Sequence, residues 1–179
     1  MTTGHVFIAT SLDGFIARPD GGIDWLLEGW PEVGHDYGFS EFMASVDGLI
    51  MGRGTFEKVQ AFETWLYSKP VVVLIRTLRQ RDVRDDLAGR VRISASAPKD
   101  VLAELEREGW KRAYVDGGQV IQSFLREGLI EDMVLTRIPT LLGEGLPLFG
   151  ALAGDIRLTH LKTTTHTSGL VESHYAVRL

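Results

Sequence analysis

The stretch that decides the fold is Leu49-Ile50-Met51-Gly52-Arg53-Gly54-Thr55-Phe56-Glu57. Its three apolar residues, bounded by glycines, predict a short buried strand, and an amphipathic helix is expected to open at Thr55. The first turn of a helix leaves backbone N–H groups unpaired, and Arg53 adds a cation beside them. This junction suits an anion such as a phosphate, although a tight turn with a solvated arginine explains the same residues equally well.

Two familiar phosphate-binding motifs are excluded at this junction. A dinucleotide-binding turn needs a third glycine three residues after Gly54, and the chain has Glu57 there. A P-loop ends in Gly-Lys followed by Ser or Thr, which is also missing. The strand, turn and helix therefore belong to another kind of α/β fold.

The composition indicates one ordinary globular domain that spans residues 1–179, with 44% hydrophobic and 24% charged residues. A net charge of −5 offers no basic face, so nucleic acid is not an expected partner. The sequence shows no signal peptide and no apolar run of the roughly 20 residues that cross a bilayer. The chain has no cysteine, which excludes disulfides and thiolate nucleophiles and fits a cytoplasmic protein.

The remaining apolar patterns alternate between strands and helices. Strands are predicted at 5–10, 49–51, 71–75, 91–94, 113–115 and 133–138, and helices at 39–46, 55–61, 98–109 and around 120–125. Two late strands, 156–165 and 170–179, are joined by Thr167-Ser168-Gly169 as an antiparallel hairpin. The expected fold is α/β and three-layered, with a mixed central sheet flanked by helices and a C-terminal hairpin.

Three junctions at predicted strand ends share one chemistry. Gly52-Arg53-Gly54-Thr55 is followed along the chain by Arg76-Thr77 and by Gly117-Gly118-Gln119-Val120. Ligands of open α/β sheets bind outside the carboxyl ends of the strands, so these junctions can converge on one elongated ligand with several phosphates.

The ordered set of motifs resembles the dihydrofolate-reductase-like superfamily. More narrowly, it is similar to the reductase domain of the bacterial bifunctional deaminase-reductase of riboflavin biosynthesis and to its stand-alone relatives. The resemblance covers nearly the whole chain and is carried by residues 8–14, 51–57, 74–77, 115–118 and 141–149. The chain lacks the His-x-Glu and Cys-x-x-Cys zinc ligands of the deaminase half, so it cannot catalyse the deamination.

The resemblance implies an NADPH-dependent reductase that passes a hydride to a C=N or C=O bond of a small pyrimidine- or pterin-like substrate. By matching position, the residues implied to bind NADPH are Gly52, Arg53 and Thr55 for phosphates, Arg76 and Thr77 for the adenosine 2′-phosphate, Gly117, Gly118, Gln119 and Val120 for the pyrophosphate, and Ala9 beside the nicotinamide. The extra phosphate of NADPH requires cations, which Arg53 and Arg76 supply.

A proton must accompany the hydride, and the candidate donors are Asp13, Glu41 and a water that they position. Asp13 is explained equally well as part of an Asp-Gly turn that closes the first strand. If neither residue donates, the chain is a non-catalytic NADPH-binding module, and a purely structural subunit would bind no NADPH at all.

The aromatic segment with Trp25, Trp30, Tyr37 and Phe39 is expected to line the substrate pocket as a lid or to cap the core. The five histidines show no metal-ligand spacing, so no metal site is expected. Apolar strand ends and the long hairpin favour a homodimer, the commonest kind of oligomer.

Overall fold

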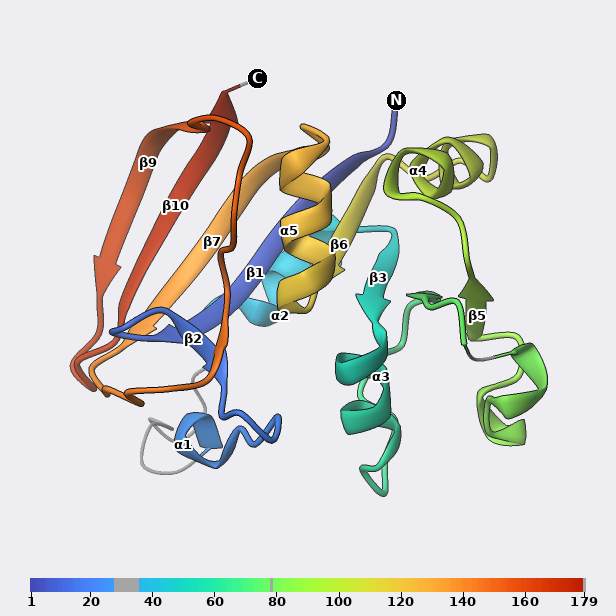
Figure 1. Ribbon diagram of the computed structural model, residues 1–179, viewed down its shortest axis with the longest axis horizontal. Coiled ribbons are helices and arrows are strands. Elements are labelled where there is room, and N and C mark those ends of the chain that lie inside the picture. The colour runs from blue at the N-terminus through green and yellow to red at the C-terminus, as the bar shows by residue number, and fades with distance from the viewer. Residues whose placement is uncertain (28–35, 78, 179) are drawn as a thin grey trace.

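The computed structural model describes residues 1–27, 36–77 and 79–178, and it contains one eight-stranded sheet with helices on both faces (Figure 1). Across the sheet the strands are β5 (Val91–Ser94), β4 (Val71–Leu74), β3 (Gly48–Gly52), β6 (Arg112–Asp116), β1 (Thr3–Ser11), β7 (Ile130–Ile138), β10 (Val171–Arg178) and β9 (Arg157–Thr165). The pairs from β5 to β7 are parallel, whereas β10 is antiparallel to β7 and to β9. The predicted mixed sheet and C-terminal hairpin are confirmed.

Two apolar cores make the fold three-layered. On the face that is nearer in Figure 1, α4 (Pro98–Arg107) and α5 (Gly118–Arg126) bury residues such as Leu105 and Phe124 against Val6 and Val115 of the sheet. On the other face, α2 (Phe39–Ser45) and α3 (Arg53–Gln60) bury Phe42 and Phe56 with Leu49 and Met51. Alternate residues of β3 therefore serve different cores, as expected for a strand buried on both sides.

Helix α3 begins at Arg53, two residues before the predicted start at Thr55. Gly52 is the N-cap residue, with an extended backbone at φ −89° and ψ 176°, so the strand passes into the helix without an intervening turn. Gly54 and Thr55 consequently lie in the first helical turn. Strand β7 begins at Ile130, three residues before its predicted start at 133, and the other predicted strands and helices agree with the structure within about two residues at each end.

Several short elements were not predicted. Two short segments, β2 (Phe15–Ala17) and β8 (Leu146–Pro147), pair as a small antiparallel sheet. This sheet contacts α5, because the side-chain amide of Gln122 donates to the carbonyl oxygen of Pro147 at 3.2 Å. A helical turn, α1 (Asp24–Leu27), follows β2, and two 3₁₀ turns, Gln80–Asp82 and Asp85–Leu87, precede β5. None of the helices described is long and apolar enough to cross a membrane.

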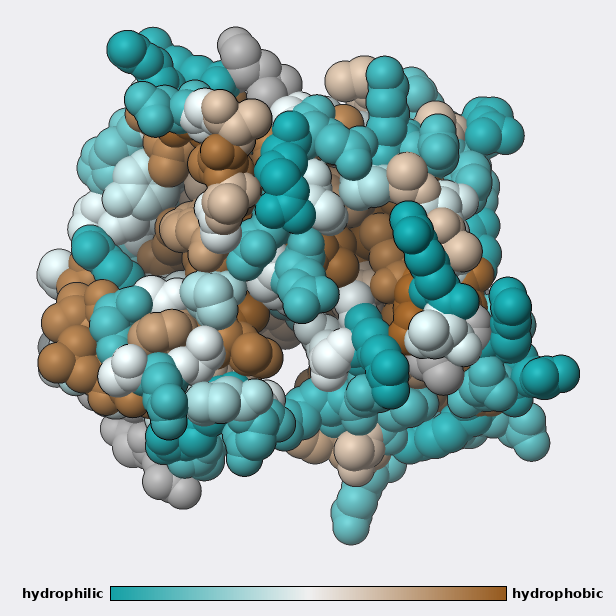
Figure 2. Space-filling view, viewed as in Figure 1, coloured by the Kyte–Doolittle hydropathy of each residue, from teal (hydrophilic) through white to brown (hydrophobic). Residues whose placement is uncertain are grey.

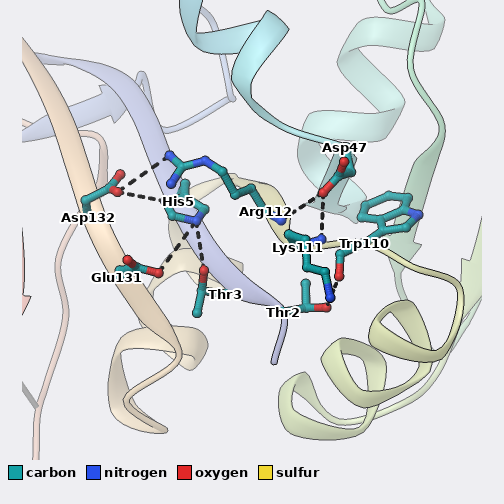
Figure 3. Close-up of polar contacts among 9 residues, drawn as sticks. All are labelled: Thr2, Thr3, His5, Asp47, Trp110, Lys111, Arg112, Glu131 and Asp132. Carbon is teal, nitrogen blue, oxygen red and sulfur yellow. Dashed lines mark hydrogen bonds and ion pairs between the residues drawn. The ribbon is translucent and has the colours of Figure 1, made fainter.

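A buried polar cluster ties the amino ends of β1, β6 and β7 together (Figure 3). The His5 side chain is fully buried, and its Nδ1 lies 2.8 Å from Oδ2 of Asp132 while its Nε2 lies 2.9 Å from Oγ1 of Thr3. Arg112 lies 3.6 Å from the same Asp132 oxygen. The backbone N–H groups of Lys111 and Arg112 donate to the Asp47 carboxylate. This cluster stabilises the sheet at the amino ends of its strands, opposite the carboxyl ends where the three junctions lie.

Candidate functional site

The carboxyl ends of β4, β3 and β6 meet at one edge of the sheet. These strands are adjacent and parallel, with Gly52 of β3 opposite Leu74 of β4 and Met51 of β3 opposite Asp116 of β6. The segments that follow them are Gly52–Thr55, Arg76–Thr77 and Gly117–Val120. The structure therefore brings all three predicted junctions together.

Close contacts between two of the junctions explain why glycines occupy them. A Cβ atom on Gly117 would lie 2.7 Å from Oγ1 of Thr55, and one on Gly52 would lie 2.9 Å from Cγ2 of Val120. Gly117 also has φ +93°, a backbone conformation that side chains of L-residues rarely adopt. A Cβ on Gly118 would lie 2.9 Å from the carbonyl oxygen of Pro147. The starts of α3 and α5 are thus held against each other and against β8.

Both helix starts offer unpaired donors to a ligand. Neither α3 nor α5 has a side-chain hydrogen bond at its N-cap, which is glycine in each case. The first N–H groups of each helix are therefore available, and the helix dipole places partial positive charge at the same point. Such an arrangement binds phosphate without any further cation.

The two predicted cations differ in their surroundings. Arg53 is 60% exposed, and its Nε donates to Oε1 of Glu57 at 2.6 Å. Arg76 and Thr77 are exposed at the end of β4, and Arg76 forms no ion pair with any residue that the structure describes. Arg76 can therefore bind a phosphate directly, whereas Arg53 must first exchange its carboxylate partner.

The remaining predicted cofactor residues contribute in different ways. Gln119 is exposed in the first turn of α5, so its side chain can reach a ligand. Val120 is buried in the core, so only its backbone N–H can do so. Ala9 lies on the face of β1 that points away from the core containing Val120, and it packs against a small cluster of Trp25, Ile138 and Leu170.

The Asp13 side chain links the β1–β2 turn to the loop that contains Leu142 and Gly143. Its carboxylate accepts hydrogen bonds from the Ser11 hydroxyl at 2.6 Å, from the Gly143 N–H at 2.8 Å and from the Leu142 N–H at 3.1 Å. These hydrogen bonds, chiefly that of Ser11, hold the pKa of Asp13 below its usual value and outweigh the opposing effect of burial. An ionised carboxylate with these partners accepts protons poorly and has none to donate at neutral pH. The geometry favours the turn-closing role of Asp13, and its catalytic role stays a prediction without structural support.

Glu41 lies in the first turn of α2 with its side chain exposed. The same helix packs Phe39 and Phe42 against Phe7 of β1, with ring centroids 5.7 and 5.0 Å apart. Glu41 is therefore anchored on a fixed helix, and its proposed proton transfer stays untested.

The aromatic segment divides between the two roles predicted for it. Trp25 is buried, and Tyr37 is half-buried with its ring 4.9 Å from that of His166. Both pack in the cluster of Ile138 and Leu170, which supports core capping for these two residues. Trp30 lies outside the described residues. In the described part of the chain no three metal-ligating side chains come together.

Asp116 is a site residue that the sequence reasoning missed. It ends β6, and alternation along the strand places its side chain on the same face as Tyr114, two residues earlier. Oδ1 accepts the Gly117 N–H at 2.8 Å. Burial raises the pKa of Asp116 to about 6, although the hydrogen bond from Gly117 and the nearby Tyr114 hydroxyl lower it in part.

Two buried phenols adjoin the Asp116 carboxyl. Burial and the charge of Asp116 raise the pKa of Tyr67 and of Tyr114, so both stay protonated. The Tyr114 hydroxyl donates its proton to the carbonyl oxygen of Phe7 at 2.9 Å. A half-buried carboxyl in apolar surroundings beside the glycine turns is the kind of group that holds a proton near neutral pH. The only sequence signal was an acidic residue directly before Gly117-Gly118.

The chain is similar to known proteins in both sequence and fold. The sequence pattern of the family described as RibD C-terminal domain matches residues 3–171. The chain is 33% identical to the uncharacterized protein YwjB of Bacillus subtilis over 171 residues, which are 95% of each chain.

Solved structures share the fold. A protein from Shewanella sp. PV-4, named for riboflavin biosynthesis, superposes with a TM-score of 0.93 at 40% identity and covers 99% of this chain and 100% of its own. A Thermotoga maritima protein, named as a diaminohydroxyphosphoribosylaminopyrimidine deaminase and 5-amino-6-(5-phosphoribosylamino)uracil reductase, superposes with a TM-score of 0.77 at 15% identity. This chain matches 57% of that longer protein and is 99% covered by it. At 15% identity the second match speaks for the fold alone.

Proposed function

The chain belongs to the RibD C-terminal domain family, and from that premise we propose that it is an NADPH-dependent reductase. The reaction is hydride transfer to a C=N or C=O bond of a small pyrimidine- or pterin-like heterocycle, related to the uracil reductase activity in the name of the Thermotoga protein. The observation that carries the proposal is the pair of uncapped helix starts, α3 and α5, held in contact by glycines at the sheet edge. A long anion with several phosphates fits this edge better than a compact one.

The residues present fit NADPH. The N–H groups at the starts of α3 and α5 would hold the pyrophosphate. The glycines keep these helix starts close together, because a Cβ on Gly52 or Gly117 would meet the side chain of Val120 or Thr55, and a Cβ on Gly118 would meet the carbonyl oxygen of Pro147. Arg76 would bind the adenosine 2′-phosphate, since its guanidinium is exposed and has no partner in the described residues. When bound, NADPH supplies the hydride.

A proton must reach the substrate atom next to the one that receives the hydride, and we assign its donation to Asp116. Its carboxyl lies at the same edge, between the apolar core and the glycine turns. Its pKa of about 6 leaves it protonated in a useful fraction of molecules near neutral pH, which suits a general acid. Asp13 and Glu41 are the alternatives predicted from the sequence, and the hydrogen bonds of Asp13 speak against it.

The second candidate function is a non-catalytic NADPH-binding module. It is favoured by one observation, namely that the Asp13 carboxylate is engaged in hydrogen bonds that close a loop, so the turn that contains Asp13 has no free proton donor. The two candidates differ in turnover with pyrimidine or pterin acceptors, since both bind NADPH and only the reductase oxidises it.

The first experiment is a titration of the purified protein with NADPH and with NADH, followed by tryptophan fluorescence, for the wild type and for Arg76→Ala and Arg53→Ala. The expected result is tighter binding of NADPH, with Arg76→Ala weakening NADPH about 10- to 100-fold and leaving NADH unchanged, as for loss of a charge-assisted hydrogen bond. Arg53→Ala should weaken both nucleotides. Glu57→Gln is the matched control, because it frees Arg53 from its carboxylate partner and should tighten binding. Failure to bind either nucleotide would overturn the proposal.

A further inference from the structure

A cavity lies on the face of the sheet that carries α5, apart from the three junctions. It measures about 340 Å³ and lies between β7, β10 and the start of β9 on one side and the β1–β2 turn and the segment after β8 on the other. Its apolar walls include Leu135, Leu148, Phe149 and Leu158. This volume is at the lower end of those that hold small organic ligands.

Hydrophobic side chains are unusually exposed around this cavity. Phe149 is 47% and Leu158 is 41% exposed, and Leu12 on the turn that forms the opposite wall is 57% exposed. Figure 2 shows hydrophobic residues gathered on this side of the same face, over β9, β10 and the segment near β8. Contact with an apolar body would remove this surface from water.

The polar groups of the cavity select for negative charge. Arg137 of β7 is exposed in its wall and forms no ion pair with any residue that the structure describes. Tyr175 of β10 also lines the cavity. Asp13 belongs to the β1–β2 turn but does not line the cavity, and its oxygens already accept hydrogen bonds from Ser11, Leu142 and Gly143. In a chain with a net charge of −5, a cavity with a cation and no carboxylate in its wall is locally complementary to an anion.

We propose that this cavity binds a small organic anion with a flat or branched apolar body, such as an aromatic carboxylate. Arg137 holds the carboxylate through paired N–H donors, and the leucines and Phe149 enclose the body. A phosphate dianion is a poorer fit, because it requires several donors and the walls are mainly apolar. The Leu148 N–H donates to the carbonyl oxygen of Gly14 at 3.0 Å, so the two segments that form this wall of the cavity are joined to each other.

The test uses two probes of the same shape, naphthalene-2-carboxylate and the neutral naphthalene-2-carboxamide, in calorimetric titrations of the full chain. We expect one carboxylate to bind per chain, at least tenfold more tightly than the carboxamide. Arg137→Gln should abolish this preference, and Leu158→Asp should weaken the carboxylate by placing a like charge at the rim. Arg90→Gln is the matched control, because Arg90 is also exposed but lies before β5, at the far edge of the sheet.

Three results would overturn the proposal. The first is equal binding of the carboxylate by the wild type and Arg137→Gln, with melting temperatures showing that both are folded. The second is the absence of saturable binding, including the case in which sedimentation shows a second copy of the chain covering this face. The third is an equal loss of NADPH binding in Arg137→Gln, which would make the cavity part of the cofactor site. Carboxylate binding without NADPH binding would support this site and refute only the proposed reductase function.

Discussion

Replacing Gly117 by alanine tests whether the contact between the two helix starts is as tight as the structure indicates. The new Cβ would lie 2.7 Å from Oγ1 of Thr55, at a position with φ +93° and ψ 133°. Forcing an L-residue into such a backbone conformation costs about 1–3 kcal/mol. Turning the Thr55 side chain away from its rotamer costs about 0.5–1.5 kcal/mol more. The expected loss of unfolding free energy is therefore about 1.5–4.5 kcal/mol.

Gly54→Ala is the matched comparison, because its Cβ would meet no atom within 4 Å and Gly54 lies within α3. Alanine at a helical position is favoured over glycine by about 0.5–1 kcal/mol, so this variant should be more stable than the wild type. Urea unfolding at constant m-value measures both changes. If Gly117→Ala lost less than 1 kcal/mol, or if the two variants changed stability in the same direction, the packing argument for the glycine turn would be refuted.

Three further predictions concern other parts of the chain. Asp116→Asn should reduce turnover about 10²- to 10⁴-fold with unchanged NADPH affinity, and it should remove the fall in activity as pH rises through about 6; an unchanged pH–rate profile would assign the proton to another group. Asp132→Ala should cost about 1–3 kcal/mol in urea unfolding, because it leaves Nδ1 of the buried His5 without its partner. Burial alone would raise the pKa of Asp132, but His5 and Arg112 outweigh burial and keep that pKa low. The stabilisation of the folded state by ionised Asp132 is therefore present above about pH 4 and is lost as the pH falls through the folded-state pKa. Asp132→Ala should lack this part of the acid dependence of stability. Sedimentation of the homodimer expected from the sequence should give a mass of about twice 19.9 kDa. Leu161→Asp should dissociate this dimer, because Leu161 is 60% exposed on the edge strand β9, where a partner could contact it.

Local patterns were sufficient to predict most elements of the fold. The strand at 91–94 agrees with β5 at both ends, and the late hairpin agrees with β9 and β10 within one residue at each end except at the C-terminus, where Leu179 lies outside the described residues. These segments are governed by alternation and turn residues, which act over a few positions. The short helix α1 and the pairing of β2 with β8 were not predicted, because a single helical turn shows no 3.6-residue period and the pairing joins segments that lie far apart in the chain.

The candidate site was predictable where it depends on the backbone and not where it depends on distant side chains. Glycines at strand ends have a local signature, so the junctions at Gly52 and Gly117 could be identified. The raised pKa of Asp116 depends on burial beside Tyr67 and Tyr114, and Tyr67 is brought there from another strand connection. The role of Asp13 in linking two loops depends on Leu142 and Gly143, which lie 129 and 130 residues away in the chain. Neither relation is visible in the order of residues.

The central position of β1 constrains how the protein can be made. Strand β1 precedes in the chain both of the strands that it pairs with, β6 and β7, and His5 meets Asp132 across 127 residues of chain. Apolar residues of β1 such as Val6 must therefore stay unpaired until β6 and β7 have been synthesised, a condition that slows folding and exposes the nascent chain to aggregation. A chaperone that shields β1 during translation should raise the yield of native protein. The same shielding applied to β5, which lies at the edge of the sheet and pairs with β4 in the described part of the chain, should change the yield little.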